Sequence, residues 1–483
     1  MQLNTLLNSS SYPEIEITGL TLDSRHVKPG DLFFAFQGMA FDGRKFIPEA
    51  LQKGAAAILT DDTKKYSSPI FSIENLSQKI GEIASRFFHE PSREMKVIGV
   101  TGTNGKTSCT HFLASSLSKL NHPCGIIGTL GNGLYGKLAE TNLTTPDGIT
   151  LQKLLADFLK QNAKHVAMEV SSHSLDQGRV NGIEFSIGIF TNLTRDHLDY
   201  HGSMENYGSA KRKLFEFSSL KSAVINADDA FGKKLIENFS DKKNIYAYSL
   251  KKSAALKNVS LIYADEIQSR NAGTYFKIFS PWGSGECFLP LIGNFNISNA
   301  LAVFTTLCLL EIPFEKNLEL ISQLNSVPGR MQTWGGDSHP LVVVDYAHTP
   351  DALEKVLIAL KEHTEGKVYC VFGCGGDRDK GKRPMMASIA EKYADFIIVT
   401  DDNPRHENPE AIVKDLQQGF SRIKPLVEHN REKAIQTAIK NASKKDCILI
   451  AGKGAEAYQI VGDEKRAFSD ASFVEIYLSK MRY

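Results

Sequence analysis

Short apolar runs alternate with amphipathic stretches along most of the chain, and this alternation predicts strands followed by helices. The runs VIGVT at 97–101, HVAMEV, FSIGIFTN and SAVINADD end in polar residues, and helical patterns separate them. The theme restarts later in LVVVDYAH, KVYCVFGCGG, ADFIIVTDDNP and DCILIAGKG. Repeated strand–helix pairs favour mostly parallel sheets with helices on both faces. We therefore expect an α/β protein with a central sheet and a Rossmann-like sheet after it.

Two polar breaks in this pattern predict three domains. Segment 1–90 mixes short alternating runs with one helical run that ends near Phe88, and it closes at a proline-containing break, 89–92. A second break, at 325–330, contains Pro328-Gly329. We expect a small α/β domain at 1–90, a central domain at 91–328 and a C-terminal domain at 329–483. Within the central domain, 259–291 is expected to be an antiparallel appendage and 300–312 a buried helix.

Composition and charge exclude several classes of function. The 483 residues include 56 Lys plus Arg and 55 Asp plus Glu, a formal net charge of +1, whereas nucleic-acid binders and polybasic membrane binders need a surplus of positive charge. The seven cysteines are scattered and never form a CxxC pair, so a reducing cytosol is the simplest location. The start of the chain lacks the pattern of a signal peptide. We expect a cytoplasmic protein with no nucleic-acid partner and no membrane span.

The strongest chemical signal is a glycine-rich loop between a predicted strand and a predicted helix. It reads Gly102, Thr103, Asn104, Gly105, Lys106, Thr107 and Ser108. Glycines let backbone N–H groups surround phosphate oxygens, Lys106 can reach the terminal phosphates, and Thr107 can hold Mg²⁺. The spacing departs from the usual P-loop, because the position six before Lys106 is Val100. A P-loop-type central sheet that binds ATP or GTP is expected.

Three residues at or after strand ends of the same segment suit a second metal. They are Glu169 in MEVSSHSL, His197 in TRDHLDYHG and Lys211 in YGSAKRKLF. A phosphoryl-transfer site must neutralise several negative oxygens, and a carboxylate with an imidazole could hold the metal for that purpose. Each residue also has an ordinary explanation: Glu169 could cap a helix, His197 could be a loop histidine, and Lys211 could be an exposed helix residue.

Other polar residues of the central segment suit a polar substrate and an adenine base. Hydroxyl, amide and guanidinium groups flank Glu169 at Thr144, Thr145, Ser171, Gln177 and Arg179. Asn296 and Asn299 could bind an adenine edge from a helix start. Helix capping before Pro146 explains the threonines about equally well, and turn or capping roles suit the asparagines.

The last segment offers two groups for binding anions. The run 375–383 is dense in cations after a strand, although a solvated loop would look similar. In Asp402-Asn403-Pro404-Arg405, the proline fixes the turn so that Arg405 can project from it. An arginine in a pocket recognises a carboxylate through two hydrogen bonds and disfavours an ammonium at that point.

Taken together, the motifs resemble those of a known family. GTNGKT, MEVSSHSL with QGRV, TRDHLDYHG, YGSAKRKLF, GNFNISN, VPGRM, VDYAHTPDAL, FGCGGDRDKGKRP and DNPR follow one another over nearly the whole chain. In this order they resemble the Mur ligase family, the ATP-dependent amino-acid ligases that build the peptidoglycan stem peptide. Within the family the sequence looks like the MurE type. The resemblance implies three domains that bind the UDP moiety, ATP and the incoming amino acid.

The resemblance also implies residue roles. UDP-sugar contacts are implied at Leu22, Ser24 and the neighbourhood of 38–41, and muramoyl-dipeptide contacts at Thr144, Thr145, Ser171, Gln177 and Arg179. ATP contacts are implied at 102–108, Asn296, Asn299, Arg330 and Asp345. Amino-acid contacts are implied at Arg378, Asp402, Asn403, Pro404, Arg405, Gly452 and Glu456. The family's lysine at the Lys211 position is carbamylated by CO₂, which makes it a carboxylate-like ligand for Mg²⁺ beside Glu169 and His197. After GKG the family usually has His-Glu, whereas this chain has Ala455-Glu456.

The expected activity is ATP- and Mg²⁺-dependent addition of meso-diaminopimelate to UDP-MurNAc-L-Ala-D-Glu through an acyl phosphate, by a monomer. DNPR is the form seen in ligases that add meso-diaminopimelate, whose extra carboxylate would pair with Arg405, whereas L-lysine lacks it. A ligase of the same fold that adds L-lysine, or one of the folylpolyglutamate type, is the nearer alternative. An ATP-hydrolysing switch or binding module is the more distant one, and it does not explain the cation-rich last segment.

Overall fold

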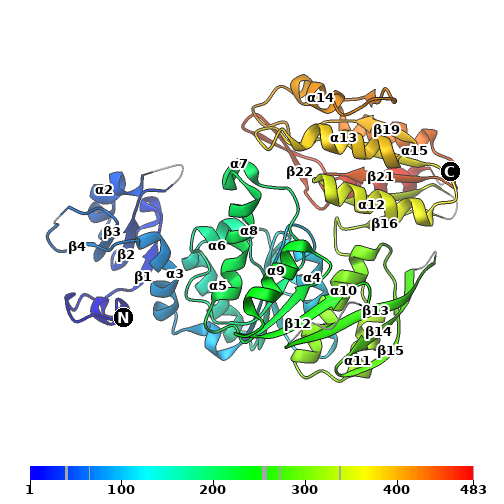
Figure 1. Ribbon diagram of the computed structural model, residues 1–483. Coiled ribbons are helices and arrows are strands. Elements are labelled where there is room, and N and C mark those ends of the chain that lie inside the picture. Colours follow the sequence, from blue (N-terminus) through cyan, green and yellow to red (C-terminus); the bar gives the residue numbers. More distant parts are fainter. Residues whose placement is uncertain (39–41, 65, 253–257, 271–272, 337–338, 482–483) are drawn as a thin grey trace. The chain divides into compact units, whose positions relative to one another are not determined.

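The computed structural model describes residues 1–38, 42–64, 66–252, 258–270, 273–336 and 339–481 (Figure 1). The chain forms two compact units. The first comprises 1–101, 117–189 and 210–223, and the second comprises 102–116, 190–209 and 224–483. The division runs through the segment predicted as the central domain, so the predicted boundaries at 90 and 328 stay a prediction.

The N-terminal part is a parallel sheet with a buried layer on each face. Its strands are β1 (Gly19–Thr21), β2 (Asp31–Ala35), β3 (Ala57–Thr60) and β4 (Ile70–Ser72), in the order β1-β2-β3-β4. Its helical elements are α1 (Leu3–Leu6), η1 (Ser24–His26), η2 (Gly43–Phe46), α2 (Ile47–Gln52), α3 (Leu76–Phe87) and η3 (Pro91–Glu94). Side chains alternate along β2, so Phe34 packs with Ile80 of α3, while Phe33 packs with Ile47 of α2. The helical run predicted to end near Phe88 is confirmed.

Among the described residues, the largest sheet has 11 strands in the order β15-β14-β13-β12-β11-β10-β5-β9-β6-β7-β8. Its strands are β5 (Lys96–Thr101), β6 (Cys124–Gly128), β7 (Gly131–Leu134), β8 (Lys137–Ala139), β9 (His165–Glu169), β10 (Phe185–Phe190), β11 (Ser222–Asn226), β12 (Asn244–Ser249), β13 (Val259–Arg270), β14 (Gly273–Ser280) and β15 (Gly283–Leu289). β5, β9 and β6 pair in parallel, whereas β13, β14 and β15 pair antiparallel. The predicted central strands and the antiparallel appendage are therefore confirmed; β6, β7, β8 and β12 were not predicted.

The helices that accompany this sheet are α4 (Lys106–Lys119), α5 (Gly148–Lys160), α6 (Ser172–Asp176), α7 (Leu198–His201), α8 (Met204–Arg212), η4 (Lys213–Glu216), α9 (Ala230–Phe239), α10 (Asn294–Leu309) and α11 (Phe314–Ser322). The run from Asn299 to Cys308 in α10 is buried throughout, which confirms the predicted buried helix. No helix in the described part of the chain combines the length and apolar character that crossing a membrane requires.

The C-terminal part is a six-stranded sheet, parallel except at one edge. Its order is β16-β17-β21-β18-β19-β20, formed by β16 (Gln332–Trp334), β17 (Leu341–Asp345), β18 (Val368–Phe372), β19 (Phe396–Val399), β20 (Leu426–Val427) and β21 (Cys447–Ala451). A hairpin of β22 (Tyr458–Val461) and β23 (Glu464–Ala467) follows. The helices are α12 (Pro350–His363), α13 (Lys382–Tyr393), α14 (Pro409–Gln417), α15 (Arg431–Asn441) and α16 (Asp470–Lys480).

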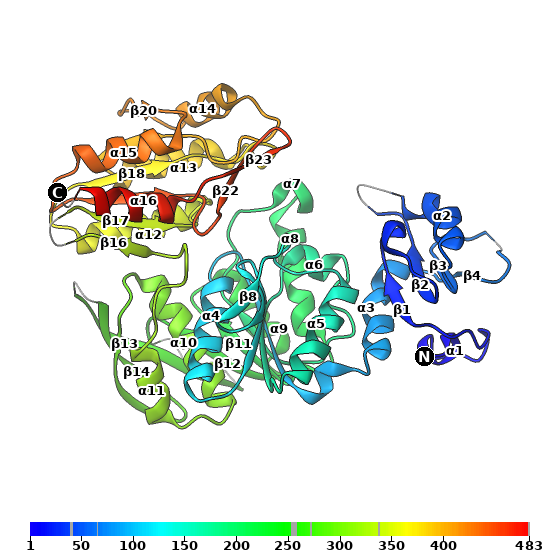
Figure 2. The ribbon, with the colours of Figure 1, turned by 180° about the vertical axis from the view of Figure 1, so that it is seen from behind.

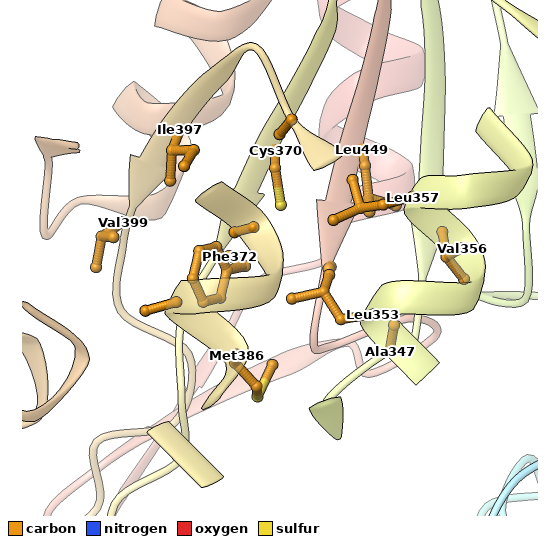
Figure 3. Close-up of a cluster of buried hydrophobic side chains, with 14 of the residues drawn as sticks. Ala347, Leu353, Val356, Leu357, Cys370, Phe372, Met386, Ile397, Val399 and Leu449 are labelled. Carbon is orange, nitrogen blue, oxygen red and sulfur yellow. The ribbon is translucent and has the colours of Figure 1, made fainter. Parts of the chain in front are cut away.

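Alternation along the central strands of this sheet explains its two layers of helices. Cys370 and Phe372 of β18 face α12 and α13, and Figure 3 shows them beside Leu353 and Met386. Val371, between them in the chain, packs on the other face with α15 and α16, which lie in front of the sheet in Figure 2. Strands buried on both faces give continuous apolar runs, which is why the sequence predicted them.

Candidate functional site

In the second unit, the glycine-rich loop Gly102–Thr107 has a conformation that requires its glycines. Gly102 and Gly105 have φ values of 148° and 89°, and a Cβ on Gly105 would lie 2.6 Å from Asn299 Oδ1. Lys106 Nζ donates hydrogen bonds to Gly102 O at 2.9 Å and to Thr103 O at 2.8 Å. The ammonium therefore lies over the loop's own carbonyls, at the start of α4, where backbone N–H groups favour an anion.

Contacts with the segment after β10 fix this loop. Thr103 N donates to Asn192 O at 2.9 Å, and Asn104 N donates to Asn192 Oδ1 at 3.0 Å. Thr103 Oγ1 donates to Thr194 O at 3.2 Å, and Thr191 Oγ1 donates to Asn104 O at 2.5 Å. A loop bonded through both its backbone and its side chains is held in one conformation, and its role in binding phosphate stays a prediction.

The predicted nucleotide residues Arg330 and Asp345 lie in the same unit. Arg330 Nη2 donates to Thr107 Oγ1 at 3.1 Å, and its guanidinium lies 4.3 Å from the ring centre of Tyr346. Asp345 accepts backbone hydrogen bonds from Met331 at 2.7 Å and from Ala347 at 2.8 Å. Burial raises the pKa of Asp345, against the opposing charge of Arg330. The structure thus brings Arg330 onto the phosphate loop, with Asp345 holding the backbone of the residue after it.

The two predicted adenine residues occupy the first turns of α10. Asn296 Nδ2 donates to Ile292 O at 2.9 Å, which is a local bond of the kind that a turn role predicts. Asn299 Oδ1 lies 3.7 Å from Cys109 Sγ, on the helix that follows the phosphate loop. Contact with adenine stays a prediction for both.

His197 belongs to a charged group around a buried carboxylate in the second unit. Asp196 Oδ2 lies 3.3 Å from His197 Nε2 and 3.5 Å from His348 Nε2, and Asp196 Oδ1 lies 3.8 Å from Lys382 Nζ. Burial opposes ionisation of Asp196, but the hydrogen bond to His348 and the neighbouring positive charges hold its pKa well below the usual value. His197 itself has a left-handed φ of 53°. The ordinary explanation, a loop histidine, describes its place at the start of α7, and metal binding stays a prediction.

In the first unit, Glu169 is a buried carboxylate at the end of β9. It pairs with Val100 in β5, two residues before Gly102 in the chain. Glu169 Oε1 accepts from Thr129 N at 2.8 Å, and Oε2 accepts from Thr129 Oγ1 at 3.2 Å. The helix that follows, α6, is capped by Ser171, so the explanation of Glu169 as a helix cap is wrong.

The predicted dipeptide residues form one hydrogen-bonded group with Glu169 in the first unit. Thr145 Oγ1 donates to Glu169 O at 2.8 Å and accepts from Ser171 N at 3.1 Å. Arg179 Nη1 donates to Thr145 O at 3.0 Å, and Arg179 Nε donates to Gln177 Oε1 at 2.8 Å. Thr144 Oγ1 lies 3.1 Å from Thr129 Oγ1. Asp147 caps α5, so the alternative that the threonines cap this helix is wrong.

Lys211, the predicted site of carbamylation, is a buried residue of the first unit. Lys211, near the end of α8, is 1% exposed, so the explanation of an exposed helix residue is wrong.

The residues implied for UDP-sugar binding lie in the N-terminal part. Ser24 is 5% exposed, and its hydroxyl donates to Glu49 Oε2 at 2.8 Å, while Leu22 is half-buried. Of the implied neighbourhood 38–41, residues 39–41 lie outside the described residues.

The predicted amino-acid pocket is a polar network at the strand ends of the C-terminal sheet. Asn403 Nδ2 donates to Glu456 Oε2 at 2.9 Å, and Lys453 Nζ, fully buried, bridges Glu456 Oε2 at 3.0 Å and Asn403 Oδ1 at 3.2 Å. Gly452 has a φ of 113°, and a Cβ there would overlap Asp402 Oδ2. The sequence assigned Asn403 and Glu456 to the pocket; Lys453 could be placed at a strand end from the sequence, but its buried position between these two residues was not predicted.

Two guanidiniums face the same region. Arg405, with a left-handed φ of 53°, donates through Nη1 to Gly376 O at 2.8 Å. Pro404 is buried, whereas Arg378 is exposed and donates through Nη1 to Asp377 O at 3.0 Å. Burial and the positive charge of Arg378 lower the pKa of Arg405. An anion is the ligand that such a pair of cations favours.

Known proteins match this chain over nearly all of its length. Family models match residues 16–100 (Mur ligase family, catalytic domain), 100–307 (Mur ligase middle domain) and 329–454 (Mur ligase, glutamate ligase domain). The UDP-N-acetylmuramoyl-L-alanyl-D-glutamate--2,6-diaminopimelate ligase of Coxiella burnetii is 49% identical, covering 97% of this chain and 97% of its own. The chain belongs to the Mur ligase family.

Other relatives carry the same name. The ligase so named in Pseudomonas aeruginosa is 47% identical, with 98% of this chain and 97% of its own covered. A solved structure of a ligase with this name superposes with a TM-score of 0.74 at 36% identity, covering 100% of this chain and 99% of that one. The predicted family and α/β fold are thereby confirmed.

Across the described ranges, no three His, Cys, Asp or Glu residues group closely enough to hold an ion. The predicted ligands include Thr107 and a modified Lys211, which lie outside that donor set. Their oxygen chemistry suits Mg²⁺, since Glu169 is a buried carboxylate and Thr107 Oγ1 stands at a helix start. The metal role of Thr107, Glu169, His197 and Lys211 stays a prediction.

Proposed function

We propose that this Mur ligase adds meso-diaminopimelate to UDP-MurNAc-L-Ala-D-Glu, with ATP cleaved to ADP and phosphate, in cytoplasmic peptidoglycan precursor synthesis. The observation that carries the proposal is 49% identity over 97% of the chain to a ligase named for these two substrates. The paired guanidiniums of Arg378 and Arg405 support the choice of a dicarboxylic amino acid. Seven buried free thiols fit the reducing cytoplasm.

The reaction divides into two steps. An oxygen of the D-Glu γ-carboxylate attacks the γ-phosphorus of ATP, and the bond to the β-phosphate oxygen breaks, which releases ADP and leaves an acyl phosphate. The diaminopimelate amine then attacks the acyl carbon. The C–O bond to phosphate breaks, phosphate leaves, and the amine loses its proton as the amide forms. No side chain needs to form a covalent bond with the substrate.

The chain's own residues supply positioning and charge for these steps. We assign the phosphate loop, including Thr103, Asn104 and Ser108, to the ATP phosphates, with Lys106 as the cation that neutralises charge on the transferred group. Asn296, Asn299, Arg330 and Asp345 are assigned to the rest of the nucleotide. Thr107, Glu169, His197 and carbamylated Lys211 are the proposed ligands of Mg²⁺, which when bound would neutralise phosphate charge.

Acceptor and amino-acid selection are assigned to separate groups. The UDP-sugar is assigned to Leu22 and Ser24, and the muramoyl-dipeptide to Thr144, Thr145, Ser171, Gln177 and Arg179. The amino acid is assigned to Arg378, Asp402, Asn403, Pro404, Arg405, Gly452 and Glu456. The carboxylate of Glu456, held by Asn403 and Lys453, is suited to an ammonium, while Arg405 is suited to a carboxylate. An amino acid with both groups at its far end satisfies both sites, and we propose that the protein acts as a monomer.

The test is a coupled ADP-release assay in which the acceptor and each candidate amino acid are supplied one at a time. We expect ADP release only with ATP, Mg²⁺, UDP-MurNAc-L-Ala-D-Glu and meso-diaminopimelate together. Equal rates with L-lysine would contradict the amino-acid assignment, and ligation to a folate would place the protein with folylpolyglutamate-type ligases. ATP turnover without any amino acid would favour a switch or binding module instead.

A further inference from the structure

The loop that carries Arg405 is fastened to a second loop, which carries Arg378. Gly376 N donates to Asn403 O at 2.9 Å, and Arg405 Nη1 donates back to Gly376 O at 2.8 Å. A Cβ on Gly376 would overlap Pro404 O, so the two backbones touch directly. The two loops follow the adjacent parallel strands β18 and β19, so the relative position of the two arginines depends on the contacts between these loops.

A buried arginine stands behind this junction. Arg383, in the first turn of α13, is fully buried, and its Nη1 and Nη2 donate to the two carboxylate oxygens of Glu407 at 2.8 and 2.7 Å. Nη2 also donates to Gly375 O at 3.2 Å. Nη1 further donates to Asp415 Oδ2, on α14, at 2.8 Å. One guanidinium thus binds the loop of Arg378, the loop of Arg405 and a helix beyond them.

Glu407 completes the link between the loops. It lies two residues after Arg405 in the chain, and its Oε2 accepts from Asp377 N, next to Arg378, at 3.2 Å. Lys380 Nζ lies 3.0 Å from Oε1. The hydrogen bond from Arg383, against the opposing effect of burial, lowers the pKa of Glu407 to about 2, so this carboxylate is charged throughout the working range of pH.

We propose that Arg383 and Glu407 are positioning residues that set the amino-acid specificity of the ligase by fixing the pose of Arg378 and Arg405. Two guanidiniums held near each other repel, and Arg405 has a left-handed backbone conformation that a residue with a side chain adopts at a cost. A bidentate ion pair is a rigid fastening that opposes both effects. A buried ion pair contributes little to the net free energy of folding, so its main effect here is to fix the relative position of the two loops. This inference rests on the proposed function.

The test compares two carboxylates that contact the same guanidinium. Glu407→Gln keeps the size of the side chain but removes the charge and the second acceptor that hold Arg383 and Asp377 N together. Asp415→Asn removes the other ion pair of Arg383 and leaves both loops untouched, which makes it the matched control. Arg383→Lys keeps the positive charge but loses the pair of nitrogen atoms that bind both carboxylate oxygens of Glu407. We measure kcat and KM for meso-diaminopimelate, ATP and the acceptor, the rate with L-lysine, and thermal stability.

We expect Glu407→Gln and Arg383→Lys to raise KM for meso-diaminopimelate by about ten-fold, the scale of one lost charge-assisted hydrogen bond, with kcat and the KM for ATP nearly unchanged. The preference over L-lysine should fall by a similar factor. Asp415→Asn should lower thermal stability without changing that preference. Equal effects of Glu407→Gln and Asp415→Asn on selectivity would overturn the inference, as would a loss of stability with an unchanged KM. An unaltered protein that fails to use meso-diaminopimelate would instead refute the proposed function.

Discussion

Replacement of Arg405 by alanine tests most directly how the pocket recognises its amino acid. Arg405 Nη1 donates to Gly376 O at 2.8 Å and to Asn403 O at 3.4 Å, whereas no described residue accepts from its Nε or Nη2. These two groups are an edge of the guanidinium that can bind a carboxylate through parallel hydrogen bonds. Burial and the nearby positive charge of Arg378 lower the pKa of Arg405, so both disfavour its charged form. A substrate carboxylate would accept hydrogen bonds from Nε and Nη2 of Arg405, and its negative charge would balance the two guanidiniums.

The expected magnitude follows from the loss of one partner of a buried charged pair. Such truncations cost about 2–5 kcal/mol, which corresponds to a fall of roughly 30- to 5,000-fold in kcat/KM for meso-diaminopimelate. L-lysine lacks the second carboxylate, so its much lower kcat/KM should change little. The ratio of the two kcat/KM values should therefore fall by at least about 30-fold.

The assay is ADP release at fixed ATP and acceptor, with each amino acid varied. Arg422→Ala is the control for the change in net charge, because Arg422 belongs to the same C-terminal part and its side chain is 73% exposed beside Glu391. Its ratio should equal that of the unaltered protein. If Arg405→Ala kept the original ratio while Tm and the KM for ATP were normal, the assignment of Arg405 to the extra carboxylate would be refuted.

Four further outcomes are expected. Lys106→Ala should abolish ADP release because the transferred phosphoryl group loses its cation, and ³¹P NMR of the reaction mixture should show ATP unchanged. Gly452→Ala, which places a Cβ against Asp402 Oδ2 at a φ of 113°, should weaken meso-diaminopimelate binding by about 1–3 kcal/mol in calorimetric titration. With ¹³C-labelled bicarbonate, NMR of the unaltered protein should show a carbamate signal that Lys211→Arg lacks. If neither protein showed this signal, carbamylation of Lys211 would be refuted. The pKa of Glu407 is about 2, against an ordinary value of 4.5. The contribution of its charge to the free energy of unfolding is therefore complete above pH 4.5 and is lost as pH falls towards 2. In urea unfolding, the difference in free energy of unfolding between the unaltered protein and Glu407→Gln should shrink as pH falls.

The strands that hold the candidate site could be predicted because burial on both faces leaves an unambiguous pattern. In β21 every residue from Cys447 to Ala451 is buried, and the corresponding run CILIA is apolar throughout. β7 and the edge strand β8 gave no such signal. Gly131 and Gly133 interrupt β7, and β8 is partly exposed, so neither alternation nor an apolar run marks them. Their place in the sheet comes from the pairing of β7 with β6 and of β8 with β7, and a local sequence pattern does not contain this information.

Single polar residues posed a different problem, because a residue type carries no record of its burial. Lys211 lies in the polar stretch YGSAKRKLF, where an exposed helical lysine is the ordinary expectation, yet it is 1% exposed. Glu169 and Thr129 are 40 residues apart in the chain and meet only because β6 and β9 are neighbours. The motif could therefore nominate Glu169, whereas the partner that orients it required the fold.

The cation-rich run 375–383 shows how far composition can mislead about a site. As a sequence it suggests one anion-binding patch or one solvated loop, but its members have separate environments. The side chain of Lys380 is 67% exposed, that of Lys382 is 7% exposed beside Asp196, and that of Arg383 is fully buried between Glu407 and Asp415. Lys380 precedes α13, whereas Lys382 and Arg383 begin this helix and contact different partners, because successive residues of a helix lie on different sides of it. Arg378 is the exposed cation of this run that lies near Arg405, where an anion could bind both. Arg383 is fully buried and holds the loops that carry these two arginines. In our proposal the specificity of the pocket therefore depends on a residue that does not contact the substrate.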